Sequence, residues 1–281
     1  MPGCGRFAPS PTGPLHQGSL VTALASFLDA RARDDRWLIR MEDLDPPREE
    51  PGAAALILNQ LAAHGLVSDE PVLVQSTRQQ AYQAALEHLI TQGRAFACQC
   101  SRSQLERDLA DGLTSRNSDG EILYTGRCRP TAAQSQSSGA CRGVQSRQAW
   151  RFRSTDGSDD FVVKRADGFW AYHLAVVVDD AEQGITRIVR GDDLRLALPR
   201  HRALQQALHL REPEVVHVPV IRNAAGEKLS KQTKATPVAI DTPRENLQQA
   251  WGHLQQHMPS DWVLEVTPAF KALLNQLAVG R

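Results

Sequence analysis

The stretch from Arg6 to Ser19, which reads RFAPSPTGPLHQGS, constrains the fold more than any other part of the sequence. It begins as a strand, passes through a turn rich in proline and glycine, and leads into an apolar helix that we expect to start near Gly18. Backbone N–H groups at a helix N-terminus have no partner within the helix and favour an anion such as phosphate. His16 can add a side-chain hydrogen bond. The stretch therefore predicts either a phosphate-binding loop or a rigid turn that His16 caps.

Apolar patterns with the periods of strands and helices alternate over the first ninety residues. The predicted strands lie at residues 4–8, 37–41 and 72–74, and the predicted helices lie at 18–33, 52–63 and around Tyr82–Ile90. This alternation predicts βαβ units and an α/β fold with a parallel sheet. Ligands of such sheets bind outside the carboxyl ends of the strands, where Ser10, His16 and Glu42 fall.

Regular patterning returns after residue 149. We expect strands at 150–153, 161–165, 185–189 and 215–221, a tight turn at Asp167-Gly168, and a helix at 200–208 that Pro199 opens. The continuous apolar run of residues 169–180 belongs in a buried position. Arg190 falls at the carboxyl end of a strand. After Lys234 the patterns are helical.

Composition excludes several classes of protein. The chain has 281 residues, 41% of them hydrophobic, and a formal net charge of zero. RNA binding would therefore need a local basic patch. No run approaches the roughly 18 apolar residues of a membrane helix, and the first residues have no signal-peptide pattern, so we expect a cytoplasmic protein without a membrane partner.

The cysteines suggest metal binding rather than disulfides, because five is an odd number. Cys98 and Cys100 are followed by Cys128, and three close cysteines are typical of a metal site. A structural zinc usually has four ligands, and the fourth could be water or Tyr124. The alternative is three reduced cysteines without a metal. Cys4 and Cys141 are interpreted as uninvolved.

Two motifs resemble the signatures of class I aminoacyl-tRNA synthetases. The stretch from Arg6 to Ser19 is similar to the "HIGH" signature in the form that glutamyl and glutaminyl enzymes use, and Lys228–Gln232, KLSKQ, is similar to "KMSKS". Gln17, Ser19 and Gln232 depart from the usual pattern. The resemblance implies a Rossmann-type parallel sheet with an inserted zinc-binding subdomain. It also implies catalytic roles for the side chains of His16, Lys228 and Lys231.

Nearly the whole chain resembles one short branch of that family, the glutamyl-queuosine tRNA(Asp) synthetases. The similarity includes Arg40–Arg48, Ala175–Asp180 and the cysteine–tyrosine set. It implies ATP-dependent, tRNA-independent activation of L-glutamate, followed by transfer to the queuosine base in the anticodon loop of tRNA(Asp). It also implies Mg²⁺ with ATP and one structural Zn²⁺ on Cys98, Cys100, Tyr124 and Cys128. We expect a monomer.

The resemblance also implies the residues of the substrate pocket. A dicarboxylic amino acid needs cations for its carboxylates and an acceptor for its ammonium group, and which arginine meets which carboxylate stays open. The expected glutamate-binding residues are Arg6, Ala8, Ser10, Glu42, Tyr172 and Arg190. The expected ATP-binding residues are Pro9, Thr12, Gly13, His16, Gly18, Ser19 and Lys231.

The predicted organisation has four parts. The two halves of the catalytic domain are expected at residues 1–95 and 166–240. The inserted zinc-binding subdomain is expected at 96–165, with a flexible polar excursion at 131–148. A short helical cap is expected at 241–281, without an anticodon-binding domain. Two other functions stay open. One is a truncated glutamyl- or glutaminyl-tRNA synthetase, and the other is a catalytically dead paralogue that binds RNA or an amino acid.

Overall fold

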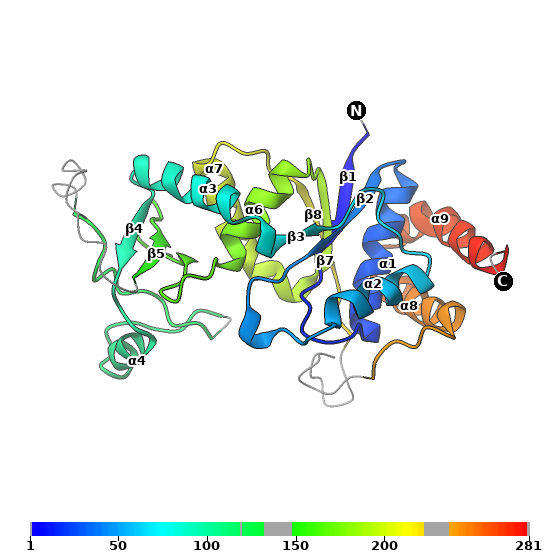
Figure 1. Cartoon of the computed structure of the whole chain (residues 1–281), viewed down its shortest axis with the longest axis horizontal. Coiled ribbons are helices and arrows are strands. Elements are labelled where there is room, and N and C mark those ends of the chain that lie inside the picture. Colours follow the sequence, from blue (N-terminus) through cyan, green and yellow to red (C-terminus); the bar gives the residue numbers. More distant parts are fainter. Residues whose placement is uncertain (1, 119, 132–147, 222–235, 280–281) are drawn as a thin grey trace. The chain divides into compact units, whose positions relative to one another are not determined.

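The computed structural model describes residues 2–118, 120–131, 148–221 and 236–279 (Figure 1). The chain divides into two compact units. The first contains residues 1–77, 182–195 and 212–281, and the second contains residues 78–181 and 196–211. The segment 96–165, predicted to be an insertion, falls inside the second unit.

Parallel strands form the centre of the first unit, as the alternating pattern predicted. β1 (Cys4–Phe7), β2 (Arg36–Met41) and β3 (Leu73–Val74) pair in that order, and β7 (Arg187–Gly191) pairs with β8 (Glu214–Val218). The backbone N–H of Thr186, just before β7, donates to the carbonyl of Cys4 at 2.9 Å, so β7 begins beside β1. Helices α1 (Gln17–Ala32) and α2 (Ala53–Ala63) make the connections from β1 to β2 and from β2 to β3.

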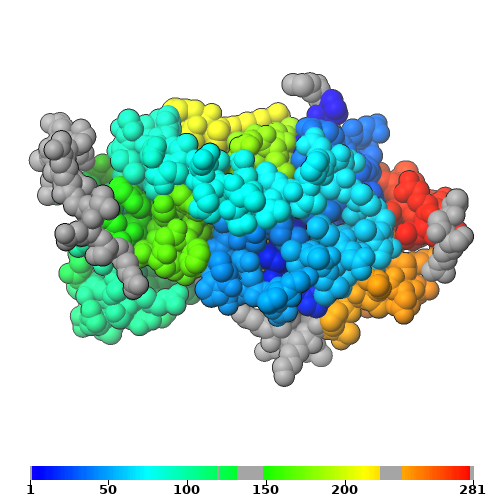
Figure 2. All heavy atoms as spheres, viewed as in Figure 1, coloured from blue at the N-terminus to red at the C-terminus, as the bar shows by residue number. Residues whose placement is uncertain are grey.

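The core of this unit forms around α1. Leu20, Leu24 and Leu28 recur on one face of the helix and are fully buried. Helices α8 (Pro243–His257) and α9 (Ser260–Val279) pack on α1 and confirm the helical patterns near the C-terminus. Figure 2 shows α8 in orange and α9 in red beside each other. The rings of Trp251 and Phe270 stack between them with centroids 4.6 Å apart.

A buried carboxylate ties α1 to its neighbours. Asp29 accepts hydrogen bonds from Trp262 Nε1 at 2.8 Å and from Arg187 Nε at 2.7 Å. Asp29 is 3% exposed, and a polar side chain buried to this extent needs such hydrogen-bond partners. The same contacts therefore fix α9 and β7 against α1.

The second unit contains an antiparallel sheet. β4 (Ala95–Cys98), β5 (Ala149–Phe152) and β6 (Val162–Lys164) pair in order, and a tight turn through Gly168 returns the chain to a bridge between Lys164 and Trp170. The described residues of this unit also form the helices α3 (Gln79–Thr91), α4 (Arg102–Ala110), α6 (Tyr172–Glu182) and α7 (Leu198–Ala207). The apolar run at 169–180 is buried as predicted, and most of it forms α6.

None of the helices in the described ranges is long and apolar enough to span a membrane. The KLSKQ motif and most of the polar excursion at 131–148 lie outside the described residues.

Candidate functional site

The predicted phosphate-binding loop connects β1 to α1, and His16 is the residue that caps the helix. Its Nδ1 accepts a hydrogen bond from the backbone N–H of Ser19 at 3.2 Å. Its Nε2 lies 3.2 Å from Ser19 Oγ. When Nδ1 is an acceptor, the neutral ring carries its hydrogen on Nε2 and can donate from there. Ser19, a departure from the usual signature, thus orients the histidine.

The turn before His16 depends on glycine and on contacts with the β2 side of the sheet. Gly13 has φ of +128°, and a Cβ there would lie 3.1 Å from Glu50 Oε2. The backbone N–H of Glu50 donates to the carbonyl of Pro11 at 3.0 Å, and that of Glu42 donates to the carbonyl of Pro9 at 2.9 Å. The loop is therefore held against the segment that follows β2.

Three of the predicted glutamate-binding residues lie on neighbouring strands of the first unit. Arg6 is the third residue of β1, Arg190 belongs to β7, and Glu42 directly follows β2. Arg6 is 4% exposed and Arg190 is 3% exposed, while the Glu42 side chain is 10% exposed and lies 3.5 Å from Arg40 Nη2. Buried charges of both signs at this edge suit a zwitterionic ligand.

The other predicted ligand-binding residues differ in position. Pro9 and Gly13 are buried, Ala8, Thr12, Gly18 and Ser19 are half-buried, and Ser10 is exposed, all in the loop or the first turn of α1. Tyr172 begins α6 in the second unit, so its membership of the pocket stays a prediction. Lys228 and Lys231 lie outside the described residues.

Sequence reasoning missed Gln60, which connects the loop to a distant segment. Its Oε1 accepts from the backbone N–H of Leu15 at 2.8 Å, and its Nε2 donates to the carbonyl of Val238 at 2.8 Å. Val238 also donates its own N–H to the carbonyl of Leu15 at 2.8 Å. Gln60 is 2% exposed, and a buried polar residue on an otherwise apolar helix face was the available signal. It holds the chain just after the KLSKQ region against the phosphate-binding loop.

Gln17, another departure from the usual signature, also has a structural partner. Its Nε2 donates to the carbonyl of Asn246 in α8 at 3.0 Å. The Asn246 side chain in turn donates to the carbonyl of Ala239 at 2.8 Å and lies 3.1 Å from His64 Nε2. Polar contacts therefore link the start of α1 with α2, α8 and the segment after residue 236.

The second unit brings together the cysteines predicted to bind a metal. The sulfur atoms of Cys98, Cys100 and Cys128 lie within 4.8 Å of one another, and this group could hold a metal ion. Tyr124 Oη is 3.5 Å from Cys98 Sγ and 3.9 Å from Cys100 Sγ, and it accepts from the backbone N–H of Cys128 at 2.6 Å. Cys4 is buried in the first unit, whereas the cluster belongs to the second.

Burial shifts the pKa values of these candidate ligands when no metal is bound. It raises the pKa of Cys100 to about 12, and it also raises the pKa of Tyr124. For Cys128 burial opposes ionisation, but hydrogen bonds from the Gln99 backbone and from Tyr124 outweigh it and lower the pKa. A divalent cation would stabilise the anionic form of every donor.

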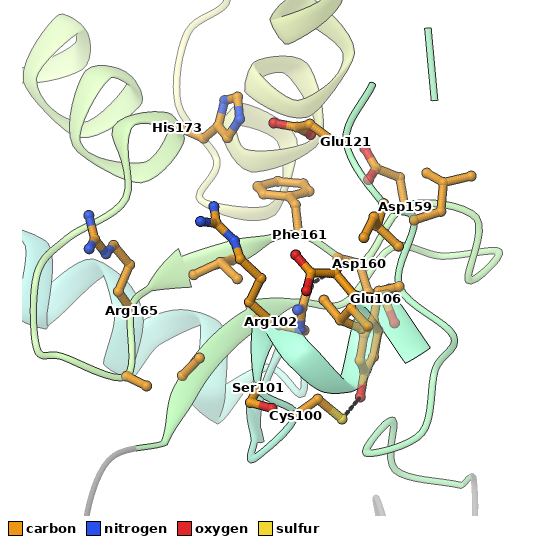
Figure 3. Close-up of a pocket in the computed structure, with 18 of the residues that line it drawn as sticks. Cys100, Ser101, Arg102, Glu106, Glu121, Asp159, Asp160, Phe161, Arg165 and His173 are labelled. Atoms are coloured by element: carbon orange, nitrogen blue, oxygen red, sulfur yellow. Dashed lines mark hydrogen bonds between the residues drawn. The ribbon is translucent and has the colours of Figure 1, made fainter. Parts of the chain in front are cut away.

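A cavity of about 1010 Å³ lies beside the cysteine cluster within the second unit (Figure 3). Arg102 and His173 point into it from α4 and α6, and Phe161 forms part of its wall. Arg200, which also lines it, donates to Asp159 and Glu121, each at 2.7 Å. The cavity is thus lined by both cations and carboxylates.

Comparison with known proteins gives a consistent result. The family described as tRNA synthetases class I (E and Q), catalytic domain, matches residues 4–258. The Glutamyl-Q tRNA(Asp) synthetase of Thiobacillus denitrificans is 54% identical over 82% of this chain and 78% of its own length. The protein of the same name from Chromobacterium violaceum is 47% identical over 92% of this chain and 88% of its own length.

Solved structures agree on the fold. A glutamate tRNA ligase from Elizabethkingia meningosepticum, crystallised with its amino acid, superposes with a TM-score of 0.68 at 27% identity. The match covers 83% of this chain but 52% of that one, so this chain spans about half the length of that ligase.

Proposed function

We propose that this chain, which belongs to the class I tRNA synthetases (E and Q) and within them to the Glutamyl-Q tRNA(Asp) synthetase group, activates L-glutamate with ATP and transfers it to queuosine in tRNA(Asp). Membership of the family makes the chain a ligase. The observation that carries the proposal is the buried set of Arg6, Arg190 and Glu42 beside a helix-capping loop of the family's signature type.

The charges of the proposed pocket would select glutamate over glutamine. The two arginines would each hold one carboxylate of the substrate, and Glu42 would accept from its ammonium group. Glutamine has nearly the same shape but lacks the second negative charge. Leaving a buried guanidinium without that charge would weaken glutamine binding, because desolvated cations need an anionic partner. Ala8, Ser10 and Tyr172 complete the proposed pocket.

The loop between β1 and α1 would bind the phosphates of ATP. In the activation step a glutamate carboxylate oxygen attacks the α-phosphorus, and the bond to the bridging oxygen breaks to release pyrophosphate. Negative charge develops on the phosphates, where the N-terminal amides of α1 can donate. His16 Nε2–H would donate there by exchanging its Ser19 Oγ partner for a phosphate oxygen. Lys228 and Lys231 would neutralise the leaving pyrophosphate, and Mg²⁺ would accompany ATP. Pro9, Thr12, Gly13, Gly18 and Ser19 would shape the nucleotide site.

We further propose that the cysteine cluster binds one structural Zn²⁺ with Tyr124 as the fourth ligand. In a tetrahedral site with Zn–S bonds of about 2.3 Å, two sulfurs lie about 3.8 Å apart and a sulfur and an oxygen about 3.5 Å apart. Cys100 Sγ and Cys128 Sγ are 3.6 Å apart, and Cys98 Sγ is 3.5 Å from Tyr124 Oη. The donor set therefore fits zinc in both chemistry and spacing. Its role would be to hold the segment after β4 to the segment around residue 128.

In the second step a hydroxyl of queuosine would attack the acyl carbon of the adenylate, and AMP would leave. The names of the relatives support tRNA(Asp) as the acceptor. A monomer acting in the cytoplasm is the simplest form of the proposal.

Glutamate-dependent ATP–pyrophosphate exchange tests the first step. We expect exchange with glutamate alone, little with glutamine or aspartate, and no requirement for tRNA. Lys231→Ala should lower the rate by orders of magnitude, while Lys234→Ala, a matched lysine outside the motif, should not. Radiolabelled glutamate offered with tRNA(Asp) that contains or lacks queuosine then tests the acceptor.

The outcomes separate the alternatives. Exchange that needs tRNA(Glu) or tRNA(Gln) would instead identify an ordinary synthetase acting on the 3′ end. Absence of exchange under all these conditions would identify a paralogue that binds without catalysis. Labelling that does not depend on queuosine would refute the proposed acceptor.

A further inference from the structure

A buried arginine contacts the proposed metal ligands. Arg151, in the middle of β5, is 7% exposed. Its Nε donates to Cys98 Sγ at 3.4 Å, and its guanidinium lies over the ring of Tyr124, 4.1 Å from the ring centroid. One side chain therefore contacts two of the four proposed ligands. The pairing of β4 with β5 brings it to Cys98, because Arg151 is opposite Phe96 and two residues from Ala149, the partner of Cys98.

The other hydrogen bond of Arg151 goes to a neutral group and not to a carboxylate. Its Nη1 donates to the backbone carbonyl of Asp160 at 2.9 Å. The Asp160 carboxylate is bound instead by Arg129 and by Ser154, whose N–H and Oγ donate at 2.9 Å and 2.8 Å. Within the described residues, no carboxylate forms an ion pair with Arg151. A desolvated cation normally requires an anion nearby.

A loaded metal site would supply that anion. Three thiolates and one phenolate carry four negative charges, of which a divalent zinc neutralises two. The site would therefore be a dianion in a partly buried position, and such a site needs a neighbouring cation as much as Arg151 needs an anion. A guanidinium that donates to a thiolate sulfur also lowers the charge density on that ligand and fixes its orientation.

We infer that Arg151 is the counter-cation of the zinc site, and that it strengthens metal binding by donating to Cys98 and covering the Tyr124 ring. This role rests on the proposed zinc site. Arg151 is a positioning residue, since it acts through the ligands and not on the metal itself.

The experiment measures zinc affinity by competition with a chromophoric chelator, using the full chain. Arg151→Gln keeps hydrogen-bond donors and approximate size but removes the charge, and we expect it to weaken zinc binding by about 10–100-fold. Arg151→Lys restores the charge without the fork and should recover part of that loss. Arg107→Gln is the matched control, because Arg107 is an exposed arginine of α4 whose side chain donates to Gln104. The zinc affinity of this control variant should equal that of the unmodified chain.

Thermal unfolding distinguishes this role from ordinary packing. Arg151→Gln should lower the melting temperature of the zinc-loaded protein more than that of the metal-free protein, because all four donors are held as anions only when the metal is bound. Equal lowering in both forms, or zinc affinity within two-fold of the unmodified chain, would overturn the inference. If the unmodified chain binds no zinc, the proposed metal site itself is wrong.

Discussion

Replacing Gln60 by leucine tests whether the contacts between the phosphate-binding loop and the distant Val238 segment hold the site together. The substitution nearly preserves the volume of the side chain but removes the acceptor for the Leu15 N–H and the donor to the Val238 carbonyl. Leu15 is 2% exposed and Val238 is 6% exposed, so water does not readily replace Gln60. The carbonyl of Leu15 keeps a partner, because it still accepts from the N–H of Val238.

The magnitude follows from the two orphaned groups. A buried donor or acceptor left without a partner costs about 1–3 kcal/mol, so Gln60→Leu should lower the free energy of unfolding by about 2–6 kcal/mol. Urea unfolding followed by tryptophan fluorescence measures this loss. Asn59→Leu is the control, because Asn59 is the exposed neighbour on the same helix. The KM for ATP in pyrophosphate exchange should rise more than the KM for glutamate, since the loop is the proposed nucleotide site.

Two results would refute this reasoning. A loss of stability no larger than that of Asn59→Leu would mean that the two backbone groups find other partners. Equal effects on both KM values would mean that Gln60 supports the fold without positioning the loop.

Three other predictions concern pH, a buried ion pair and the metal. Burial lowers the pKa of His64 below the usual 6.5 of a histidine. The stability that neutral His64 contributes is therefore complete above pH 6.5 and is lost as the pH falls through the lowered pKa. Urea unfolding between pH 7.5 and 5.5 should show this loss and a shallower one in His64→Gln; identical slopes would contradict it. Asp29→Asn should cost about 1–3 kcal/mol, because Arg187 loses the carboxylate that accepts from its Nε but keeps its ion pair with Glu214. Asp34→Asn at an exposed turn should cost little in the same assay. Tyr124→Phe should retain less zinc per chain than the unmodified protein after a chelator challenge, measured by elemental analysis, and equal retention would exclude Tyr124 as a ligand.

The sequence predicted most of the secondary structure because local patterns carry that information. The strand–loop–helix unit at residues 4–33, the parallel strands and the C-terminal helices were each visible as apolar periodicity, and the structure confirms them. The cysteine cluster was also predicted, because the spacing of Cys98 and Cys100 is a local feature and Cys128 is the next cysteine along the chain. The membership of the family followed from two motifs and is confirmed by its match over residues 4–258. The roles assigned to single site residues, and the limits of the four predicted parts, stay predictions.

The tertiary structure alone decided which polar side chains meet. Gln60 contacts residues 45 and 178 positions away in the sequence, and Arg151 contacts a cysteine 53 positions away. Neither residue belongs to a motif. Glutamine on a helix and arginine on a strand are most often solvated, so residue type alone gives no signal of burial, and the apolar helix face around Gln60 was the one indication. Periodicity shows which face of a helix or strand is apolar. A hydrogen bond between distant segments depends instead on how the whole chain folds, so the partners of Gln60 and Arg151 were decided by the tertiary structure.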